Sequence, residues 1–284
     1  MKLTFTDEQE QFRAEVAGWL EDKLSGDFAD IRGITSQTEA AQRRLEWEQA
    51  LGVAGWSAIG WPRQYGGRAA DLSQQVIFAE EYARARAPGR LGHMGVELAG
   101  PTILNFGTDA QKKRFLPKMS AGEEMWCQGY SEPGAGSDLS NVRTKARLED
   151  GPQGERWVID GQKIWTSLAQ FAHWCFVICR TQEGSQGREG LSYLLVPMHQ
   201  KGIEIRPIRQ MTGEADFNEV FFDGAVTAAE NIVGEPGQGW QVAMGTLAFE
   251  RGVSTLAQQM HFRNELNEII NEAKLNGASG DPLI

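Results

Sequence analysis

The spacing of apolar residues divides the chain into three parts, and the first part has the periodicity of helices. Thr6 and Gln9 have the spacing of a capping box, and Phe12, Val16 and Leu20 then fall on one helical face. Similar helical patterns cover residues 42–56, 71–89 and 109–119, the last after a second capping box at Thr108 and Gln111. These patterns therefore predict an N-terminal helical domain that comprises residues 1–124.

In the second part, residues 125–235, the apolar runs are short and rich in β-branched and aromatic residues. They cover residues 156–167, 173–181, 191–198, 202–211 and 217–226. Their spacing is regular and no helical pattern intervenes, which predicts an antiparallel β-domain, either a barrel or a sandwich. Asp160-Gly161 stands between two such runs and predicts a hairpin turn.

The third part, residues 236–284, returns to helical spacing. An apolar stripe continues to Asn276-Gly277 and consists of Val242, Phe249, Val253, Leu256, Met260, Leu266, Ile270 and Ala273. One long helix cannot bury such a stripe by itself, so we expect self-association or a partner subunit. The fold class expected is α+β: a helical domain, a central antiparallel β-barrel or sandwich, and the first part of a C-terminal helical bundle.

Composition narrows the class of protein. The formal net charge is −10 and the pI is about 5.0, which argues against a nucleic-acid partner. Neither a signal-like start nor a membrane-spanning apolar run is present in the sequence, and a cytoplasmic location is expected. Cys127, Cys175 and Cys179 form no CxxC pair and no zinc-like cluster, so we expect a reducing compartment and no metal site, with Cys175 and Cys179 as core residues of a strand.

A glycine-rich loop, YSEPGAGSDLSN at residues 130–141, opens the β-rich part. Gly134 and Gly136 would let backbone amides approach an anionic ligand, and Ser131, Ser137 and Asp138 add polar groups. Taken alone, this composition is more typical of a structural turn.

A second motif, DGQKIWTS at residues 160–167, changes that interpretation. It places Trp165 beside Thr166 and Ser167 on a strand, and an aromatic plane next to hydroxyls suits a flat heteroaromatic cofactor. A core tryptophan is the commoner alternative for Trp165.

Together the two motifs resemble the acyl-CoA dehydrogenase family of FAD flavoproteins. GWPRQYGG, GPTILNFGTDAQKKRFLP, MTGEADFNEVFFD and NIVGEPGQGW also resemble family signatures and occur in the family's order. The resemblance implies an N-terminal α-domain (1–124), a flavin-binding β-domain (125–235) and a four-helix bundle, of which residues 236–284 would supply only the first helix. The chain would then be C-terminally incomplete relative to the family.

The resemblance also implies the residues that hold FAD. They are Gln128, Tyr130, Ser131, Gly136, Ser137, Trp165, Thr166 and Ser167. Ser131 would bond the isoalloxazine edge, and Ser137 would reach both the flavin pyrophosphate and the pantetheine arm of the substrate. Gln128 departs from the hydroxyl residue that is common at its position, but its amide can still form hydrogen bonds.

The activity implied is dehydrogenation of an acyl-CoA thioester to the 2-enoyl-CoA. A carboxylate removes the α-proton, and the β-hydrogen leaves as hydride to the flavin. Relatives resembling isovaleryl- and long-chain dehydrogenases carry this base just before an arginine, where the chain reads LAFERGVS. Glu250 would be the base, in a dry site that raises its pKa, and Arg251 would contact the CoA arm. An exposed Glu250–Arg251 surface pair is the alternative on helical spacing alone.

The partners implied are an acyl-CoA substrate, electron-transfer flavoprotein as acceptor, and either a homo-oligomer or a heterotetramer with a related subunit. Lipid or sterol side-chain degradation is the expected setting. Two alternatives remain open: a non-catalytic or half-site subunit of a heteromeric dehydrogenase, and an acyl-CoA oxidase-like or nitroalkane oxidase-like flavoprotein.

Overall fold

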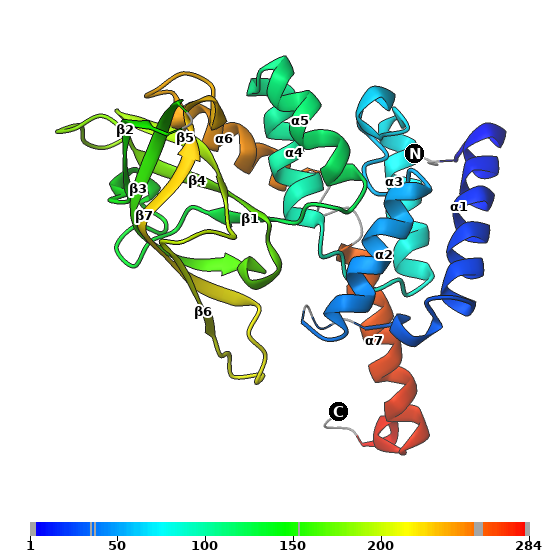
Figure 1. Cartoon of the computed structure of the whole chain (residues 1–284). Helices are drawn as coiled ribbons and strands as arrows, with labels where there is room; N and C mark the ends of the chain where they lie inside the picture. Colours follow the sequence, from blue (N-terminus) through cyan, green and yellow to red (C-terminus); the bar gives the residue numbers. More distant parts are fainter. Residues whose placement is uncertain (1–3, 35, 37, 153, 253–257, 282–284) are drawn as a thin grey trace. The chain divides into compact units, whose positions relative to one another are not determined.

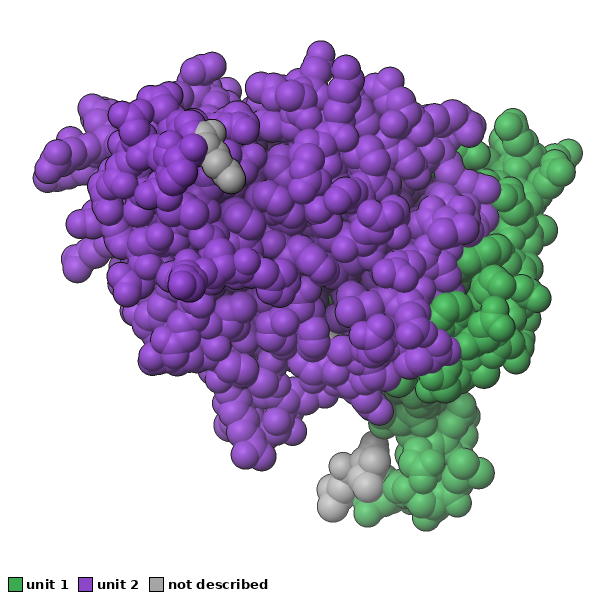
Figure 2. Space-filling view, in the orientation of Figure 1, with its two compact units in different colours: residues 1–34, 70–88, 251–284 green, residues 35–69, 89–250 purple. Residues whose placement is uncertain are grey.

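A computed structural model describes residues 4–34, 36, 38–152, 154–252 and 258–281. The chain forms two compact units, shown in different colours in Figure 2. Unit 1 comprises residues 1–34, 70–88 and 251–284, and unit 2 comprises residues 35–69 and 89–250. Each unit is therefore assembled from segments that lie far apart in the sequence.

Unit 1 is helical. Its helices are α1 (Asp7–Ser25), α3 (Leu72–Arg84) and α7 (Gln258–Leu275), with short 3₁₀ helices at Ala29–Ile31 and Ala278–Gly280. The capping box predicted at Thr6 and Gln9 is confirmed at the start of α1. Asp71 and Gln74 form another at the start of α3.

The contact between α1 and α3 combines apolar burial with ion pairs. Val16 and Leu20 of α1 and Ile77 of α3 are buried. Beside them Arg13 lies 2.6 Å from the buried carboxylate of Glu81. The apolar face predicted for the first helix is thus covered by a segment some fifty residues further along the chain.

Unit 2 contains further helices and all the strands of Figure 1. The helical segments are α2 (Ala41–Val53), a π-helix (Met94–Ala99), α4 (Gly100–Phe106), α5 (Asp109–Ser120), α6 (Gly239–Glu250), and 3₁₀ turns at Arg63–Tyr65, Leu139–Asn141, Ala169–Phe171 and Ala229–Asn231. The capping box predicted at Thr108 and Gln111 opens α5. The π-helix was not predicted from the sequence.

The strands of unit 2 form one sheet. They are β1 (Trp126–Gly129), β2 (Lys145–Gly151), β3 (Gly154–Ser167), β4 (Trp174–Arg180), β5 (Leu191–Pro197), β6 (Ile203–Ile208), β7 (Phe217–Ala228) and β8 (Ile232–Val233). The order is β6-β7-β3-β2-β4-β5-β8, with β1 added beside β4. Most pairs are antiparallel, as predicted, while β1 and β2 meet β4 in parallel.

The sheet curls on itself, which brings strands that are distant in this order together. The hydroxyl of Thr227 on β7 donates a hydrogen bond of 2.6 Å to the carbonyl oxygen of Leu195 on β5. The curled sheet encloses a core of apolar side chains from several strands, including Ile159, Val177, Leu194 and Val220. The three cysteines are buried free thiols, which confirms the core positions expected for Cys175 and Cys179.

The hairpin predicted at Asp160-Gly161 is wrong. β3 runs through both residues with only a bulge, and the chain reverses between Gly151 and Gly154 instead. Gly161 is required for a different reason, because a Cβ there would lie 2.7 Å from the Cα of Thr144. A glycine inside a strand can mark a bulge and a close backbone approach rather than a turn.

The apolar stripe predicted a single long C-terminal helix, and this prediction is also wrong. α6 ends at Glu250, Arg251 and Gly252 form a turn, and α7 begins at Gln258. Val253 and Leu256 lie outside the described residues. Val242 of α6 is buried, whereas none of the described residues of α7 is buried. No helix in the described ranges combines the length and apolar character of a membrane span.

Candidate functional site

The glycine-rich loop follows β1 and forms a tight turn. The amide of Glu132 donates to the carbonyl of Ala135 at 2.9 Å, and the amide of Ala135 donates back at 3.0 Å. Gly134 and Gly136 are exposed, neither has a positive φ, and a Cβ at either would meet no atom within 4 Å. Neither backbone conformation nor packing therefore requires glycine here, and the exposed main chain at both positions is open to a ligand.

The structure joins this loop to the second motif. The amide of Ile164 on β3 donates to the carbonyl of Ser131 at 2.9 Å. The ammonium of Lys163 donates to the carbonyl of Tyr130 at 3.0 Å. The two segments singled out in the sequence thus lie side by side, because β3 supports the loop directly.

A buried ion pair fixes this junction. The Nζ atom of Lys163 lies 2.8 Å from Oε1 of Glu132, and both side chains are buried. Glu132 also accepts hydrogen bonds from the amides of Arg143 at 2.7 Å and Thr144 at 2.9 Å. A buried carboxylate with this many donors has a defined position, and so has the loop that carries it.

The pair also shifts the two pKa values. Burial opposes ionisation of Glu132, but the charge of Lys163 and the hydrogen bonds together lower the pKa of Glu132 below its ordinary value. Burial lowers the pKa of Lys163, and Glu132 offsets this only in part. Sequence reasoning missed both residues. The available signal was a lysine at an inward position of a strand, since lysine is almost never fully buried without a partner.

Trp165 projects from the end of β3 towards solvent. Its side chain is 57% exposed, so the alternative of a core tryptophan is wrong. Its φ of +61° lies in a region that a bulky residue rarely adopts, and its ring meets the edge of Phe217 with centroids 6.0 Å apart. An exposed indole held in a strained conformation is suited to cover a flat ligand.

Next to Trp165 along the chain, Thr166 is buried, as are its β7 partner Asn218 and nearby Asp216, and these three form a polar cluster in the sequence and sheet register. Asn218 donates through Nδ2 to the carbonyl of Thr166 at 3.1 Å. Oγ1 of Thr166, Oδ1 of Asp216 and Oδ1 of Asn218 have no hydrogen-bond partner in the part of the chain that the structure describes. Buried polar atoms normally have partners, so this cluster has capacity for a ligand or an ordered water.

These features fit a flavin nucleotide. Trp165 offers a plane, Thr166 offers an unpartnered hydroxyl, Ser167 is half-buried beside it, and Gly136 leaves the loop backbone accessible next to the exposed Ser137.

Gln128 and Tyr130 take different positions at the base of the loop. Gln128 is half-buried on β1. The ring of Tyr130 packs in the core, edge-on to Phe176 and Tyr193, so its side chain is directed away from the loop. Among the described residues, no group of His, Cys, Asp and Glu side chains is arranged to hold a metal ion.

Glu250 is the last residue of α6 and is exposed in this chain. One turn earlier Thr246 is buried, and its hydroxyl lies 2.8 Å from that of Thr102. Burial raises the pKa of Tyr130, the hydroxyls of Thr246 and Tyr193 act in the opposite direction, and the charge of Glu250 is a smaller cause that raises it. Arg251 is an exposed turn residue and belongs to unit 1.

Family models match most of the chain. The model described as "Acyl-CoA dehydrogenase, N-terminal domain" matches residues 6–123, and the one described as "Acyl-CoA dehydrogenase, middle domain" matches residues 127–225. The protein named acyl-CoA dehydrogenase IpdE1 of Mycolicibacterium smegmatis is 54% identical in an alignment that covers 98% of this chain and 73% of that protein. IpdE1 of Mycobacterium tuberculosis is also 54% identical, over 97% of this chain and 71% of its own length.

Solved structures also show similarity to acyl-CoA dehydrogenases. One described as "Tcur3481-Tcur3483 steroid ACAD" is 30% identical with a TM-score of 0.84, covering 100% of this chain and 71% of that one. The ChsE4-ChsE5 complex from Mycobacterium tuberculosis is 33% identical with a TM-score of 0.74, covering 88% of this chain and 61% of that one.

Proposed function

This chain belongs to the acyl-CoA dehydrogenase family of oxidoreductases, and on that basis we propose that it serves the FAD-dependent dehydrogenation of an acyl-CoA thioester to the 2-enoyl-CoA. The observation that carries the proposal is the junction of the two motifs in unit 2. There an accessible glycine-rich loop is hydrogen-bonded to β3 at Ile164, the residue before the exposed Trp165, and the Glu132–Lys163 pair fixes the junction.

The residues that would hold FAD are those of the loop and of the end of β3. Ser131, Gly136 and Ser137 would offer hydroxyls and accessible main chain to the cofactor, and the segment 165–167 would cover its ring. Gln128 and Tyr130 would contribute from β1 and the start of the loop, Tyr130 through its main chain. Bound FAD would supply the two-electron acceptor that takes the β-hydrogen as hydride.

Glu250 is the proposed base for the α-proton. Its place at the end of α6, one turn beyond the buried Thr246, puts a carboxylate at the edge of the packed part of unit 2. A base for a weakly acidic proton needs a dry environment that raises its pKa. Since Glu250 is exposed in this chain, the bound substrate and further protein would have to supply that environment. Hydrogen bonds to the thioester oxygen would stabilise the developing negative charge.

We infer the substrate and the partners from the family resemblance and from the descriptions of similar structures. Ser137 and Arg251 would bind the CoA arm. Because one similar structure is described as a steroid ACAD and another as a complex of two differently named chains, we propose an acyl group from lipid or sterol side-chain degradation and an oligomer, homomeric or with a related subunit. Electron-transfer flavoprotein would accept the electrons.

A second candidate is a half-site subunit that completes a partner's site. The exposure of Glu250 and the exposed apolar residues of α7 favour it, because both leave groups that a further chain would cover. A flavoprotein of the acyl-CoA oxidase type would use the same residues and differ in how the reduced flavin meets oxygen.

The test is anaerobic flavin reduction by a panel of acyl-CoAs, followed by stopped-flow absorbance in the assembled enzyme. Glu250→Gln should keep the flavin and the fold and slow reduction by about 10²- to 10⁴-fold, as expected for loss of a general base. Glu235→Gln, which removes an exposed carboxylate elsewhere in unit 2, is the matched control. Reduction of Glu250→Gln at the wild-type rate would assign the base to another residue and favour the half-site alternative.

A further inference from the structure

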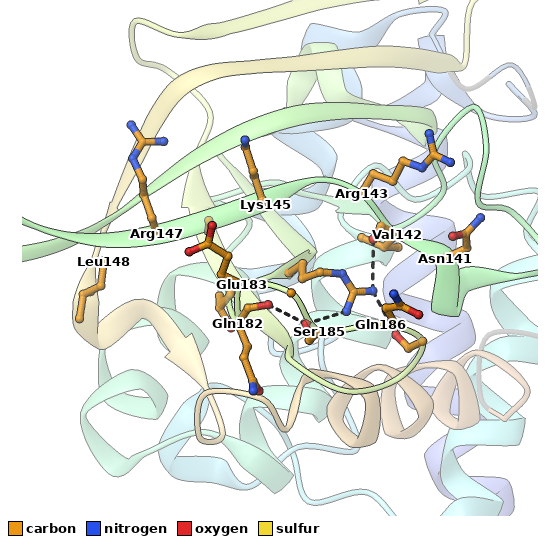
Figure 3. A pocket seen from close by; sticks show the side chains of 15 residues that line it. Asn141, Val142, Arg143, Lys145, Arg147, Leu148, Gln182, Glu183, Ser185 and Gln186 are labelled. Atoms are coloured by element: carbon orange, nitrogen blue, oxygen red, sulfur yellow. Dashed lines mark hydrogen bonds between the residues drawn. The ribbon is translucent and has the colours of Figure 1, made fainter.

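Four buried hydroxyl groups come together in unit 2, where α6 packs against α4 and against the sheet. They belong to Thr102 of α4, Tyr130 directly after β1, Tyr193 of β5 and Thr246 of α6. None of these residues lines the open cleft of about 750 Å³ between β2 and the loop that joins β4 to β5, which Figure 3 shows. Their surroundings are apolar core side chains, among which a polar group is costly unless it is hydrogen-bonded.

The two threonines join α4 to α6. Their Oγ1 atoms lie 2.8 Å apart. Oγ1 of Thr102 also lies 2.8 Å from the carbonyl oxygen of Leu98. Oγ1 of Thr246 lies 3.1 Å from the carbonyl oxygen of Val242. Each hydroxyl has one proton to donate, so two protons serve these three contacts. The bridge between the threonines can therefore form together with one main-chain hydrogen bond, whichever threonine donates.

Two glycines let α6 approach its neighbours closely. A Cβ atom on Gly245 would lie 2.6 Å from Cε2 of Phe106 on α4. A Cβ atom on Gly239, the first residue of α6, would lie 2.5 Å from the Cα atom of Ser192 on β5. A larger residue at either place would displace α6 or its neighbour. α6 is thus held closely by β5 at its start and by α4 further along, just before the turn that ends at Glu250.

The tyrosines extend the cluster to the start of the glycine-rich loop. The ring of Tyr130 meets that of Tyr193 edge-on, with centroids 6.3 Å apart. Neither phenol hydroxyl has a hydrogen-bond partner of ordinary geometry among the described residues. Burial raises the pKa of both tyrosines, and the nearby hydroxyl of Thr246 acts in the opposite direction on each. Thr246 is thus close both to α4 and to Tyr130, the residue that precedes Ser131.

We propose that Thr246, paired with Thr102, is a positioning residue for Glu250. The role rests on the proposed function, in which Glu250 removes the α-proton while the flavin held by the loop takes the β-hydrogen. These two hydrogens leave adjacent carbon atoms, so the carboxylate and the flavin must be kept at one separation.

The threonine bridge suits this role because of where it lies. Glu250 is exposed at the end of α6, so the buried turn before it determines where the carboxylate lies. A hydrogen bond between side chains is directional, whereas apolar contacts alone would let a helix rotate or slide. The bridge therefore fixes the rotation of α6 one turn before the carboxylate.

Anaerobic reduction of the flavin by an acyl-CoA, followed by stopped-flow absorbance in the assembled enzyme, is the first test. Thr246→Val removes the hydroxyl and keeps the branched shape. It should lower the limiting rate constant of reduction by about 10- to 100-fold, as expected for a misplaced base. The acyl-CoA concentration that gives half of the limiting rate should stay unchanged. Thr246→Ser restores the hydroxyl and should recover most of the rate.

Hydrogen exchange followed by mass spectrometry is the second readout and does not depend on flavin chemistry. In Thr246→Val the amides of residues 247–250 should exchange about 5- to 10-fold faster, the equivalent of one lost hydrogen bond. Thr102→Val breaks the same bridge from α4 and should have the same effects on rate and exchange. Thr227→Val is the matched control, because its buried hydroxyl donates to the carbonyl of Leu195 on β5, and its loss should change neither.

The outcomes separate this role from the proposed function. Wild-type rates in Thr246→Val and Thr102→Val, with Glu250→Gln slow, would overturn the positioning role and leave the proposed function intact. Faster exchange with an unchanged rate would mean that the bridge only stabilises α6, which also overturns the role. Reduction of Glu250→Gln at the wild-type rate would overturn both, because no base would then stand at the end of α6.

Discussion

Nζ of Lys163 lies 2.8 Å from Oε1 of Glu132, and this pair joins the glycine-rich loop to β3 in the interior of unit 2. Replacing a buried ion pair by apolar residues is often neutral or stabilising, so the pair is not explained by stability alone. What it provides is position: Glu132 lies inside the loop, and Lys163 lies two residues before Trp165. A shift of either would change the distance between the loop backbone and the indole ring.

Glu132→Gln should lower the free energy of unfolding by about 3–5 kcal/mol, because it leaves the ammonium of Lys163 buried without a counter-charge. The double variant Glu132→Gln/Lys163→Met should lose clearly less free energy of unfolding than the two single variants lose together, since the unpaired charge is removed. Urea unfolding followed by tryptophan fluorescence measures all three. Additive losses would show that the two side chains do not stabilise each other.

The Glu132–Lys163 pair also predicts that the stability of the fold depends on pH. Because the pKa of Glu132 is lower in the folded chain, its contribution to stability is complete above the ordinary value of 4.5 and is lost as the pH falls through the folded-state value. The wild type should therefore lose more stability between pH 6 and pH 3 than the double variant does. Thermal melts across that range measure the difference, and parallel curves would contradict it.

Gly136→Val should abolish flavin binding without unfolding the chain. A side chain at this position meets no protein atom within 4 Å, so it would project into the space that a ligand would use. Gly18→Val, at a helix position that is equally unobstructed, is the control. Flavin absorbance after reconstitution and the melting temperature are the two readouts. Normal flavin content in Gly136→Val would remove the loop from the binding site.

His173 should make stability sensitive to mild acid. Its Nδ1 atom accepts a hydrogen bond from the amide of Met125 at 3.0 Å, which requires that nitrogen to be unprotonated. Burial lowers the pKa of His173 from the ordinary value of 6.5, and the neighbouring His199 lowers it further, while Glu124 acts in the opposite direction. The unfolded chain then binds the proton more readily, so stability falls as the pH drops below about 6.5.

His173→Asn should flatten this dependence, because its Oδ1 atom can take the place of Nδ1 as acceptor and does not titrate. Melting temperatures at pH 7.5 and 5.5 should differ less in this variant than in the wild type. His261→Asn, at an exposed histidine of α7, should retain the wild-type difference. A variant as acid-sensitive as the wild type would mean that other groups carry the effect.

The described part of α7 should drive self-association. Phe262, Leu266 and Ile269 are each more than half exposed on this helix. Leu266→Glu combined with Ile269→Glu keeps good or adequate helix formers and removes apolar surface, so it should shift the chain towards a monomer. Light scattering across a concentration series measures the mass. A monomeric wild type would contradict the expectation from the apolar stripe.

Local signals in the sequence predicted local structure well. Thr6 with Gln9 and Thr108 with Gln111 form the capping boxes expected of them, because the interacting groups are three residues apart and need no tertiary context. Asp160-Gly161 shows the limit of such reasoning. The same dipeptide serves a turn or a strand bulge, and the close approach of Thr144, which lies on another segment, decides between them.

The candidate site was predicted in part. The composition of the loop and the residue types around Trp165 indicated a ligand, but the supporting groups were not visible. Glu132 and Lys163 are thirty residues apart and look like ordinary charged residues until their burial is known.

The composite make-up of unit 1 has a consequence for synthesis of the protein. α3 packs against both α1 and α7. Asn264 of α7 donates a hydrogen bond to the carbonyl of Ala83, and Glu268 of α7 forms an ion pair with Arg86. Residues 89–250 of unit 2 are translated between α3 and α7, so α1 and α3 emerge from the ribosome well before the third helix of their unit. Vectorial folding would thus allow unit 2 to fold first and leave α1 and α3 without the packing of α7 until residues 258–275 have emerged.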